Sequence, residues 1–430
     1  MDFSYLHPAD QLVMFMQRIY DKSMTTTSGG NLSIKDKDGN IWITPASIDK
    51  GTLRREDIVC VKPDGTIEGI HKPSSELPFH SSVYKNRPEM KAVLHAHSPG
   101  LVAFSIVRKK PNLSLLGNVH ALCGDMPIAV YACPGSNKLG ENIGEQFAKG
   151  YDVVLLENHG ICICAENMFD AFKKFEACEY SANLEILASR LGTPRSLTTE
   201  QLTGYGTTDH LTMDSFAPYV PSSEELEVRR DMIKFIRRSY KQGLFTAMHG
   251  TYSARLSDGS FIITPYAKDR YYLSESDLVR IYGTKREIDK IPSRAVKAHA
   301  AIYEKHPEIK AVMLAHPVNA MAFAVTDAKF DPCTIPESYI LLRDVEKLPY
   351  EFIMENPEAT ADHLGVAHPA IMCENNCVIV TGASLLQAFD RLEVMEATAH
   401  SIINSLSIGD IQHISKDEVD ELKVAFKLQD

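Results

Sequence analysis

Apolar positions near the start of the chain recur with the period of a helix. In "HPADQLVMFMQRIYDK", residues 7–22, the side chains of Leu12, Phe15, Met16, Ile19 and Tyr20 follow the i, i+3, i+4 spacing. This spacing puts them on one face and predicts an amphipathic helix. The stretch "SSEELEVRRDMIKFIRRSYK", residues 222–241, has the same plan, and Ser222 followed by Glu225 predicts a capping box at its start.

Short runs rich in β-branched and apolar residues lie between the helical patterns. The runs "NIWITP", "AVLHAH" and "YDVVLLENHGICICA" predict strands. The stretches "PSSELPFHSSVYKN" and "NMFDAFKKFEACEYSANLEILASRL" predict helices that flank them. The alternation indicates an α/β sandwich in which helices cover a central sheet.

The chain contains this pattern twice. "DGNIWITPASIDK" matches "DGSFIITPYAKDR", and "AFKKFEACEYSANL" matches "AFDRLEVMEATAHS". "KPSSELPFHSSVYKNRPEMKAVLHAHSPG" matches "IPSRAVKAHAAIYEKHPEIKAVMLAHPVN" across 29 positions without an insertion. We therefore expect two divergent copies of one domain, at residues 1–195 and 222–430, joined by a Thr- and Ser-rich linker or tail at residues 196–221.

Composition narrows the class of protein. A length of 430 residues suits two domains, and 44% hydrophobic with 23% charged residues is typical of a globular chain. No apolar run reaches the length of a membrane span, and a net charge of −11 argues against nucleic acid as a partner. Nine scattered cysteines and a polar N-terminus without a signal-peptide pattern predict a cytoplasmic protein.

The strand "AVLHAH" carries the first candidate chemistry. His95 and His97 are two positions apart, so they share one face of a strand. An isolated pair of this kind is more often structural, but His159 in "LLENHGI" lies at a Gly-containing bend and is a candidate third ligand. Three neutral histidines with an open position are typical of a catalytic zinc site, whereas structural zinc sites are rich in cysteine.

Residues before a predicted helix add a carboxylate and anion-binding groups. Glu76 opens the helix, and Ser74 and Ser75 offer hydroxyls and helix N-terminal amides to an anion. The stretch "TTTSGGNLS" offers a second anion-binding turn at Gly30 and Asn31. Plainer interpretations stay open, because a glutamate at a helix start commonly complements the helix dipole and a Ser-Gly-Gly-Asn segment is commonly only a turn.

The ordered set "SGGNLS", "ITPAS", "PSSE", "HAH", "VYACPG" and "ENHG" resembles the class II aldolase/adducin family in order and spacing. The resemblance is closest to the L-fuculose-phosphate aldolase branch and covers residues 8–192, and the second copy resembles the same domain. It implies an α/β/α sandwich around a largely antiparallel sheet. It also implies four-fold rings with sites between neighbouring subunits.

The resemblance assigns roles to individual positions. It implies one zinc ion per chain, with Glu76 as the metal-proximal general acid/base. The zinc ligands that it implies are His95, His97 and His159, with Glu76 also on the metal until the substrate displaces it. The phosphate-binding positions that it implies are Gly30, Asn31, Ser74 and Ser75. After "ITP" this chain has Ala46 and Ser47 where family aldolases usually read Thr-Gly or Ser-Gly, so Ser47 is only a candidate replacement, and a phosphorylated substrate stays open.

The implied activity is reversible cleavage of a ketose 1-phosphate, or a related sugar, to dihydroxyacetone phosphate and an aldehyde. Tyr205 is a candidate proton donor at the aldehyde oxygen, or an ordinary linker residue. Epimerases on this scaffold carry Asp where this chain has Glu76, which favours an aldolase. Dehydratases and decarboxylases of the family remain alternatives, as does an adducin-like binding module, although adducins lack the histidine set.

The second copy has lost the candidate site. Glu76 is replaced by Ala295, His95 by Leu314, His159 by Asn376 and Asn31 by Thr251, and His97 is retained as His316. We therefore expect the second copy to bind no zinc and to catalyse nothing. Because its apolar pattern is kept, we expect it to serve assembly, with a homodimer forming a four-domain pseudo-tetrameric ring.

Overall fold

The computed structural model describes residues 3–205 and 209–428, and they form two compact units. The first is Met1–Asn183 and the second is Leu184–Asp430, so the boundary falls within one long helix, α6 (Met168–Leu191). Each unit holds one sheet with helices against it, which confirms the predicted α/β class in two copies. The segment predicted as a linker contains a short helix, α7 (Thr199–Thr203), and a short strand, β9 (Ser215–Phe216).

The first unit follows the predicted alternation of strands and helices. Its strands are β1 (Asn31–Lys35), β2 (Ile41–Ile43), β3 (Val59–Val61), β4 (Ile67–Glu68), β5 (Ala92–Ala96), β6 (Ile128–Ala129), β7 (Val153–Leu156) and β8 (Gly160–Ala165). Its helices are α1 (Pro8–Asp21), α2 (Leu77–Asn86), α3 (Pro99–Ile106), α4 (Gly117–Cys123), α5 (Asn137–Ala148) and α6.

The second unit repeats this series. Its further strands are β10 (Thr251–Arg255), β11 (Phe261–Ile263), β12 (Val279–Tyr282), β13 (Lys285–Glu287), β14 (Ala311–Ala315), β15 (Glu346–Leu348), β16 (Ala370–Cys373) and β17 (Cys377–Gly382). Its further helices are α8 (Ser223–Gln242), α9 (Val296–Lys305), α10 (Val318–Ala324), α11 (Pro336–Leu342), α12 (Phe352–Glu355), α13 (Pro357–Asp362), α14 (Leu385–Ser405) and α15 (Lys416–Ala425).

The two sheets have one topology. The strand order is β4-β3-β2-β1-β5-β8-β7-β6 in the first unit and β13-β12-β11-β10-β14-β17-β16-β15 in the second, where β9 adds a parallel edge strand beside β13. Apart from that edge and the parallel β6–β7 and β15–β16 pairs, neighbouring strands are antiparallel. The duplication inferred from sequence is therefore a duplication of the whole sheet.

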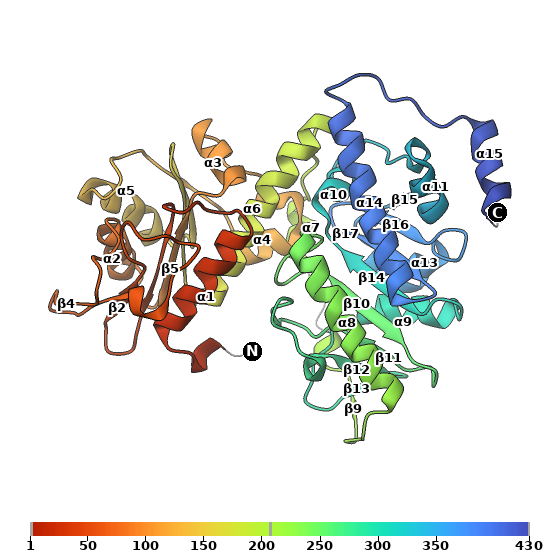
Figure 1. The fold of residues 1–430 in the computed structure, drawn as a ribbon, viewed down its shortest axis with the longest axis horizontal. Coiled ribbons are helices and arrows are strands. Elements are labelled where there is room, and N and C mark those ends of the chain that lie inside the picture. The colour runs from red at the N-terminus through yellow and green to blue at the C-terminus, as the bar shows by residue number, and fades with distance from the viewer. Residues whose placement is uncertain (1–2, 206–208, 429–430) are drawn as a thin grey trace. The chain divides into compact units, whose positions relative to one another are not determined.

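Helices cover both faces of each sheet (Figure 1). In the first unit, α2 and α5 pack on one face around Phe79, Val93 and Phe147. Phe15 of α1 packs against Phe172 of α6 in a second helical layer. This is the α/β/α sandwich that the resemblance implied, and none of the described helices combines the length and apolar character needed to cross a membrane.

Helix α8 begins at the predicted N-cap Ser222, but the predicted capping box is wrong because the Glu225 side chain does not return to the Ser222 amide. The Ser222 hydroxyl accepts a hydrogen bond from the Glu225 amide (3.1 Å), which satisfies one of the free N–H groups at the start of α8. The Glu225 carboxylate is engaged elsewhere, by the guanidinium groups of Arg229 and Arg280. The apolar face of α8 is buried, as Met232 and Ile236 show.

Candidate metal centre

Strand β5 lies in the middle of the first sheet and carries the first histidine of the site. Its register pairs His95 with Asn31 of β1 on one side and with Cys162 of β8 on the other. His97 follows directly after the strand, and His159 lies in the tight turn between β7 and β8, where Asn158 takes a positive φ of 51°. Two segments distant in sequence thus place their three imidazoles together.

The three histidines form a compact cluster. One ligand atom from each of His95, His97 and His159 lies within 4.8 Å of the others, and within the described residues this is the one such group of three found. The His95 and His97 Nε2 atoms are 2.9 Å apart. Glu76 adds a carboxylate, with oxygens 3.2 Å from His95 Nε2 and 3.4 Å from His159 Nε2. The structure therefore brings together the three predicted ligands and the predicted acid/base.

Glycines allow the backbone to close around these side chains. A Cβ atom at Gly30, whose φ is 70°, would lie 2.7 Å from the His95 carbonyl oxygen. A Cβ atom at Gly160 would lie 2.5 Å from the Ala96 carbonyl oxygen and 2.9 Å from a ring carbon of His97. Both distances are shorter than any side chain tolerates, so glycine is required at these two positions.

The electrostatics favour neutral imidazoles, which are the form that binds a metal. Burial, together with the neighbouring His97 and His159, holds the pKa of His95 well below its usual value. Burial likewise lowers the pKa of His97 and of His159. The Nδ1 of His95 donates to the Ile161 carbonyl (2.8 Å), which leaves the lone pair of its Nε2 directed at the cluster. Clustered neutral nitrogens beside a carboxylate suit a divalent cation.

A chain of hydrogen bonds ends at the Glu76 carboxylate. The Asn31 side-chain amide donates to Glu76 Oε2 (2.7 Å), so the Asn31 Oδ1 is the acceptor for His80 Nε2 (2.5 Å). His80 Nδ1 must then accept from the Ser33 hydroxyl (2.7 Å), which in turn accepts from the Tyr84 hydroxyl (2.8 Å). Every donor points toward Glu76, so the chain fixes both the position and the acceptor role of the carboxylate.

Sequence reasoning missed the members of this chain beyond Asn31. His80 is fully buried, which lowers its pKa to about 3, and burial raises the pKa of the Tyr84 hydroxyl. Both groups are therefore neutral and serve as structural donors and acceptors. A signal for them was present, because the repeat alignment leaves Ser33, His80 and Tyr84 identical in the second copy, as Ser253, His299 and Tyr303.

The segments predicted to bind phosphate are joined by hydrogen bonds. The Ala46 amide donates to the Lys72 carbonyl (3.0 Å), the Ser74 amide to the Thr44 carbonyl (3.2 Å), and the Lys50 amide to the Thr27 carbonyl (3.0 Å). The Ser74 hydroxyl accepts from the Glu76 amide (3.3 Å) at the start of α2, and Ser75 is exposed beside it. The predicted anion-binding loops therefore lie together at the helix start.

Two further positions complete this surface. Ser47 is exposed in a turn with a positive φ of 58°, so its hydroxyl is accessible. Lys50, which sequence reasoning did not single out, is buried with its ammonium group 2.6 Å from the Pro45 carbonyl oxygen. Burial lowers its pKa to about 8. Its cationic charge lies beneath the Ser47 turn, and the repeat keeps a cation there as Arg270.

Tyr205, the candidate proton donor, lies in the second unit. Its hydroxyl accepts a hydrogen bond from Arg294, and the Arg294 guanidinium carbon lies 4.4 Å from its ring centroid. Burial raises the pKa of Tyr205, so the phenol is protonated near neutral pH. These contacts are with the second copy rather than with the histidine cluster, and the catalytic role of Tyr205 stays a prediction.

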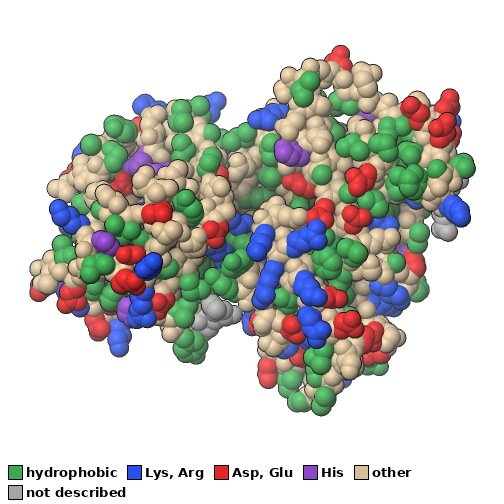
Figure 2. Space-filling view, in the orientation of Figure 1, with side chains coloured by type: hydrophobic (Ala, Val, Ile, Leu, Met, Phe, Trp, Pro, Cys, Tyr) green, Lys and Arg blue, Asp and Glu red, His purple; other side chains and the backbone are tan. Residues whose placement is uncertain are grey.

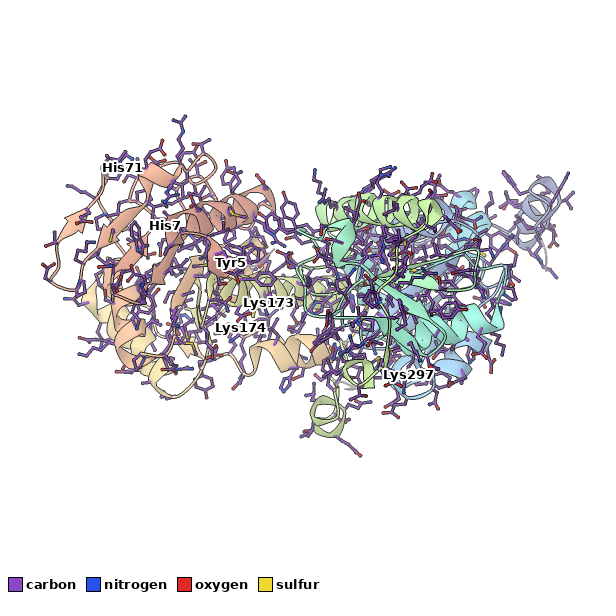
Figure 3. The ribbon with its side chains drawn as sticks, turned by 90° about the horizontal axis from the view of Figure 1, so that it is seen from below. Tyr5, His7, His71, Lys173, Lys174 and Lys297 are labelled. Atoms are coloured by element: carbon purple, nitrogen blue, oxygen red, sulfur yellow. The ribbon has the colours of Figure 1, made fainter. Side chains whose placement is uncertain are left out.

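Other histidines of the first unit have local explanations (Figure 3). His7 caps α1 through its Nδ1, which accepts from the Ala9 amide (3.2 Å), and packs edge-on against Trp42. His71 bonds to the Asp57 carboxylate at 2.9 Å. These two rings thus take part in packing and capping, each away from the cluster of His95, His97 and His159.

The corresponding place in the second unit lacks the ligands. β14 carries Leu314 opposite Thr251 of β10, in the same register as His95 and Asn31. The Thr251 hydroxyl bonds to the Ser293 hydroxyl (2.6 Å). His316 remains buried, which lowers its pKa to about 4, and its ring centroid is 5.5 Å from that of His249. The substitutions read from the sequence therefore lie where the metal ligands of the first copy lie.

Comparison with known proteins gives a consistent result for both copies. The family model for the class II aldolase and adducin N-terminal domain matches residues 10–186 and 230–403. The chain is 34% identical over 183 residues to L-fuculose phosphate aldolase of Methanococcus maripaludis, covering 42% of this chain and 97% of that one. It is 31% identical over 177 residues to 3-oxo-tetronate 4-phosphate decarboxylase of Haemophilus influenzae, covering 40% and 84%.

Solved structures include similar chains. An L-fuculose 1-phosphate aldolase is 32% identical with a TM-score of 0.43, over 46% of this chain and 92% of that chain. YgbL of Escherichia coli, described as a putative aldolase/epimerase/decarboxylase, is 28% identical with a TM-score of 0.43, over 45% and 95%.

Proposed function

The chain belongs to the class II aldolase and adducin family, and from this premise we propose that its first copy is a zinc-dependent carbon–carbon lyase. The substrate is a ketose 1-phosphate or a related sugar, and the products are dihydroxyacetone phosphate and an aldehyde. The observation that carries the proposal is the Glu76 carboxylate held 3.2 Å and 3.4 Å from two imidazoles of the histidine cluster. An acid/base beside a metal centre is what proton transfer at a carbon next to a carbonyl requires.

His95, His97 and His159 would hold the metal. When bound, the ion supplies a Lewis acid that polarises the carbonyl of the substrate. In the cleavage direction, the hydroxyl of the aldehyde half loses its proton as the carbon–carbon bond breaks. Glu76 delivers a proton to the carbon of the remaining three-carbon half, and in synthesis it removes that proton. Asn31 keeps the carboxylate in place through its 2.7 Å hydrogen bond.

The remaining roles follow the loops described above. Gly30, Asn31, Ser74 and Ser75, with Ser47, surround the start of α2 and would receive the phosphate of the substrate. Amides and hydroxyls at a helix N-terminus are well suited to a phosphate group. Tyr205 is our candidate proton donor to the aldehyde oxygen in synthesis, a role for which its raised pKa keeps the phenol protonated, and in cleavage its phenolate form takes that proton back.

Decarboxylation of a phosphorylated 3-oxo acid is a second candidate. It is favoured by the 31% identity to a protein named 3-oxo-tetronate 4-phosphate decarboxylase. Both reactions break a bond to a carbon beside a carbonyl, and the same metal and carboxylate serve both. The two differ in their products, because one releases an aldehyde and the other releases carbon dioxide.

The test is a product assay on zinc-loaded full-length protein. Ketose 1-phosphates, free ketoses and phosphorylated 3-oxo acids are supplied separately, and dihydroxyacetone phosphate and carbon dioxide are both measured. We expect dihydroxyacetone phosphate from at least one ketose 1-phosphate. Carbon dioxide alone would reassign the reaction to decarboxylation, and no product from any substrate would overturn the lyase proposal.

We also infer that the second copy serves assembly, so that two chains form a pseudo-tetrameric ring. The support is the repeated sheet topology without the ligands. Light scattering should give the mass of a dimer, and a monomer with full activity would contradict the inference.

A further inference from the structure

A segment of the second unit covers the end of helix α10. It consists of residues 192–205, directly after α6, and we call it the α6 tail. The Arg195 amide donates to the Val325 carbonyl (2.8 Å), and the Asn375 side-chain amide donates to the Arg195 carbonyl (2.6 Å). Val325 and the adjacent Thr326 are both 0% exposed. The α6 tail therefore closes the surface where α10 meets the turn at Asn375.

The corresponding surface of the first unit is exposed. Ile106 and Val107, at the end of α3, are each 59% exposed, although their counterparts after α10 are fully buried. Asn158, the counterpart of Asn375, is also exposed, and its backbone amide donates to the Ser105 carbonyl (3.2 Å) of the same helix. We call Ile106, Val107 and Asn158 the α3 surface. One place of the fold is thus covered in the second copy and open in the first.

The chain holds a second segment of the same kind, directly after α14. "GTPRSLTTEQLTGY", residues 192–205, aligns without an insertion with "GDIQHISKDEVDEL", residues 409–422. Each contains a capping box that starts a helix, at Thr198 for α7 and at Ser415 for α15. We call residues 409–426 the α14 tail. It is the repeat of the segment that covers α10.

The α14 tail presents apolar side chains that its own unit leaves uncovered. None of the residues of α15 is buried, and Val424 and Phe426 are 80% and 56% exposed. Leu197 of the α6 tail is buried, whereas its counterpart Ile414 is partly exposed. The α14 tail therefore has an apolar face without a cover, and the α3 surface has apolar side chains without a segment over them.

The two surfaces also differ in charge. The α3 surface continues into the exposed basic run "RKK", residues 108–110, where the second copy has "DAK". Helix α15 carries four acidic side chains against two lysines, and Figure 2 shows Asp and Glu side chains gathered over it. Its exposed acidic residues are Asp417, Glu418, Asp420 and Glu421. Opposite charges on two surfaces speed their association and help to select the correct partner.

We propose that the α3 surface of one chain is the docking site for the α14 tail of a second copy of this chain. The contacts of the α6 tail give the register, in which Gln412 takes the place of Arg195. The Gln412 amide then faces the Ile106 carbonyl, and the Gln412 carbonyl faces the side-chain amide of Asn158. The docking rests on the assembly inferred above and is independent of the lyase activity. Two chains close on each other in this way, because each offers one α3 surface and one α14 tail.

Cross-linking between chains that carry one new cysteine each tests the proposal. Chains with Ile106→Cys and chains with Gln412→Cys are co-expressed under different tags and treated with a short bis-maleimide. A covalent pair that contains both tags is expected, because a backbone hydrogen bond joins the equivalent residues Val325 and Arg195 (2.8 Å). Ile70→Cys, at another exposed isoleucine of the first unit, replaces Ile106→Cys in the control and should give no such pair.

Light scattering of the parent and two further variants gives a second measurement. Ile106→Glu puts a carboxylate into the apolar contact and opposite an acidic helix, so self-association should weaken roughly 10- to 100-fold. Ile70→Glu should associate as the parent does. Melting curves identify a variant that does not fold, and if Ile106→Glu is one, the cross-link alone decides.

The outcomes separate the docking from the assembly. A dimeric parent with no cross-link and no effect of Ile106→Glu overturns the docking and leaves the assembly inference standing. A monomeric parent overturns both. A link that forms only when one chain carries both new cysteines shows that the tail docks on its own chain, and it overturns the role of a second copy.

Discussion

The two copies share a buried, hydrogen-bonded set of three residues, and only in the first copy does this set connect to the catalytic carboxylate. Ser33, His80 and Tyr84 are linked at 2.7 Å and 2.8 Å, and their counterparts Ser253, His299 and Tyr303 at 2.6 Å and 2.7 Å. In the first copy His80 continues to Asn31 and so to Glu76. In the second copy the chain stops at His299, and the Thr251 hydroxyl bonds to the Ser293 hydroxyl instead.

The loss of the asparagine leaves one buried ring nitrogen of the second copy without a partner among the described residues. The Nε2 of His299 is buried, and within the described part of the chain it has no hydrogen-bond partner. A buried donor without a partner is costly, on the order of 1–3 kcal/mol. The copy has therefore kept a histidine that serves the fold through Ser253 while losing the asparagine that connected it to chemistry. The histidine at this position can therefore support the fold in a copy where it no longer supports catalysis.

The largest effect expected is on catalysis in the first copy. Glu76→Gln keeps the shape of the side chain and its contact with Asn31 but removes the base, so turnover should fall on the order of 10²- to 10⁴-fold. Metal content should be unchanged. Glu141→Gln, at an exposed position of α5, is the control. Steady-state rates measure both, and turnover within a few-fold of the parent in Glu76→Gln would place the base elsewhere.

The acid sensitivity of both copies should come partly from their matched histidines. Burial lowers the pKa of His80 and of His299 to about 3, whereas an unfolded histidine titrates near 6.5. The unfolded state binds more protons between these values, so this contribution to stability is complete above pH 6.5 and is lost as the pH falls toward 3. The slope is about 1.4 kcal/mol per pH unit for each histidine.

Denaturant unfolding at a series of pH values measures that slope. His80→Phe and His299→Phe each remove one titrating group, so the stability gap between parent and variant should narrow as the pH falls below 6.5. A gap that is constant from pH 7.5 to pH 4 would show that these histidines do not carry the effect.

Replacing each histidine by phenylalanine separates its contribution to stability from its contribution to catalysis. His80→Phe removes two hydrogen bonds, to Ser33 and to Asn31, whereas His299→Phe removes only the bond to Ser253. Each lost buried bond costs on the order of 1–3 kcal/mol, so His80→Phe should be the more destabilising. Only His80→Phe should also lower turnover, roughly 10- to 100-fold, because it releases the residue that holds Glu76. Equal loss of activity in both variants would contradict the comparison.

The smallest effect is a gain of stability. Thr251→Asn supplies an acceptor for His299 Nε2 in the second copy and should stabilise the protein by about 1 kcal/mol. The reciprocal Asn31→Thr should destabilise the first copy by a similar amount. Chemical denaturation measures both, and a loss of stability in Thr251→Asn would show that His299 needs no acceptor.

The sequence predicts the histidine ligands of the first copy but not the order of its strands, and both outcomes have physical reasons. Strand alternation puts His95 and His97 on one side, and the break at Gly160 puts His159 in a turn, so the sequence alone predicts these ligands. The sheet order was not predicted, because pairing between β1 and β5 joins segments about 60 residues apart. The role of His80 also depends on that pairing, which brings Asn31 beside α2.

The contact of Tyr205 with Arg294 could not be predicted from the sequence either. Its position in a Thr-rich segment suggested a catalytic tail residue or an ordinary linker residue, and no periodic pattern connected it to Arg294. The contact depends on where α7 ends relative to Arg294 within the second unit, which local spacing does not encode. Ser222 was predicted correctly as an N-cap because capping is a local interaction.

Metal content of the full-length chain and three variants tests the central claim that one copy is a metal centre and the other is not. Mass spectrometry of protein purified with zinc should give one ion per chain for the parent and for His316→Asn, and none for His159→Asn. Asn376→His should still give one, because Leu314 supplies no nitrogen in the second copy. Two ions per chain in the parent, or an ion retained in His159→Asn, would contradict the account.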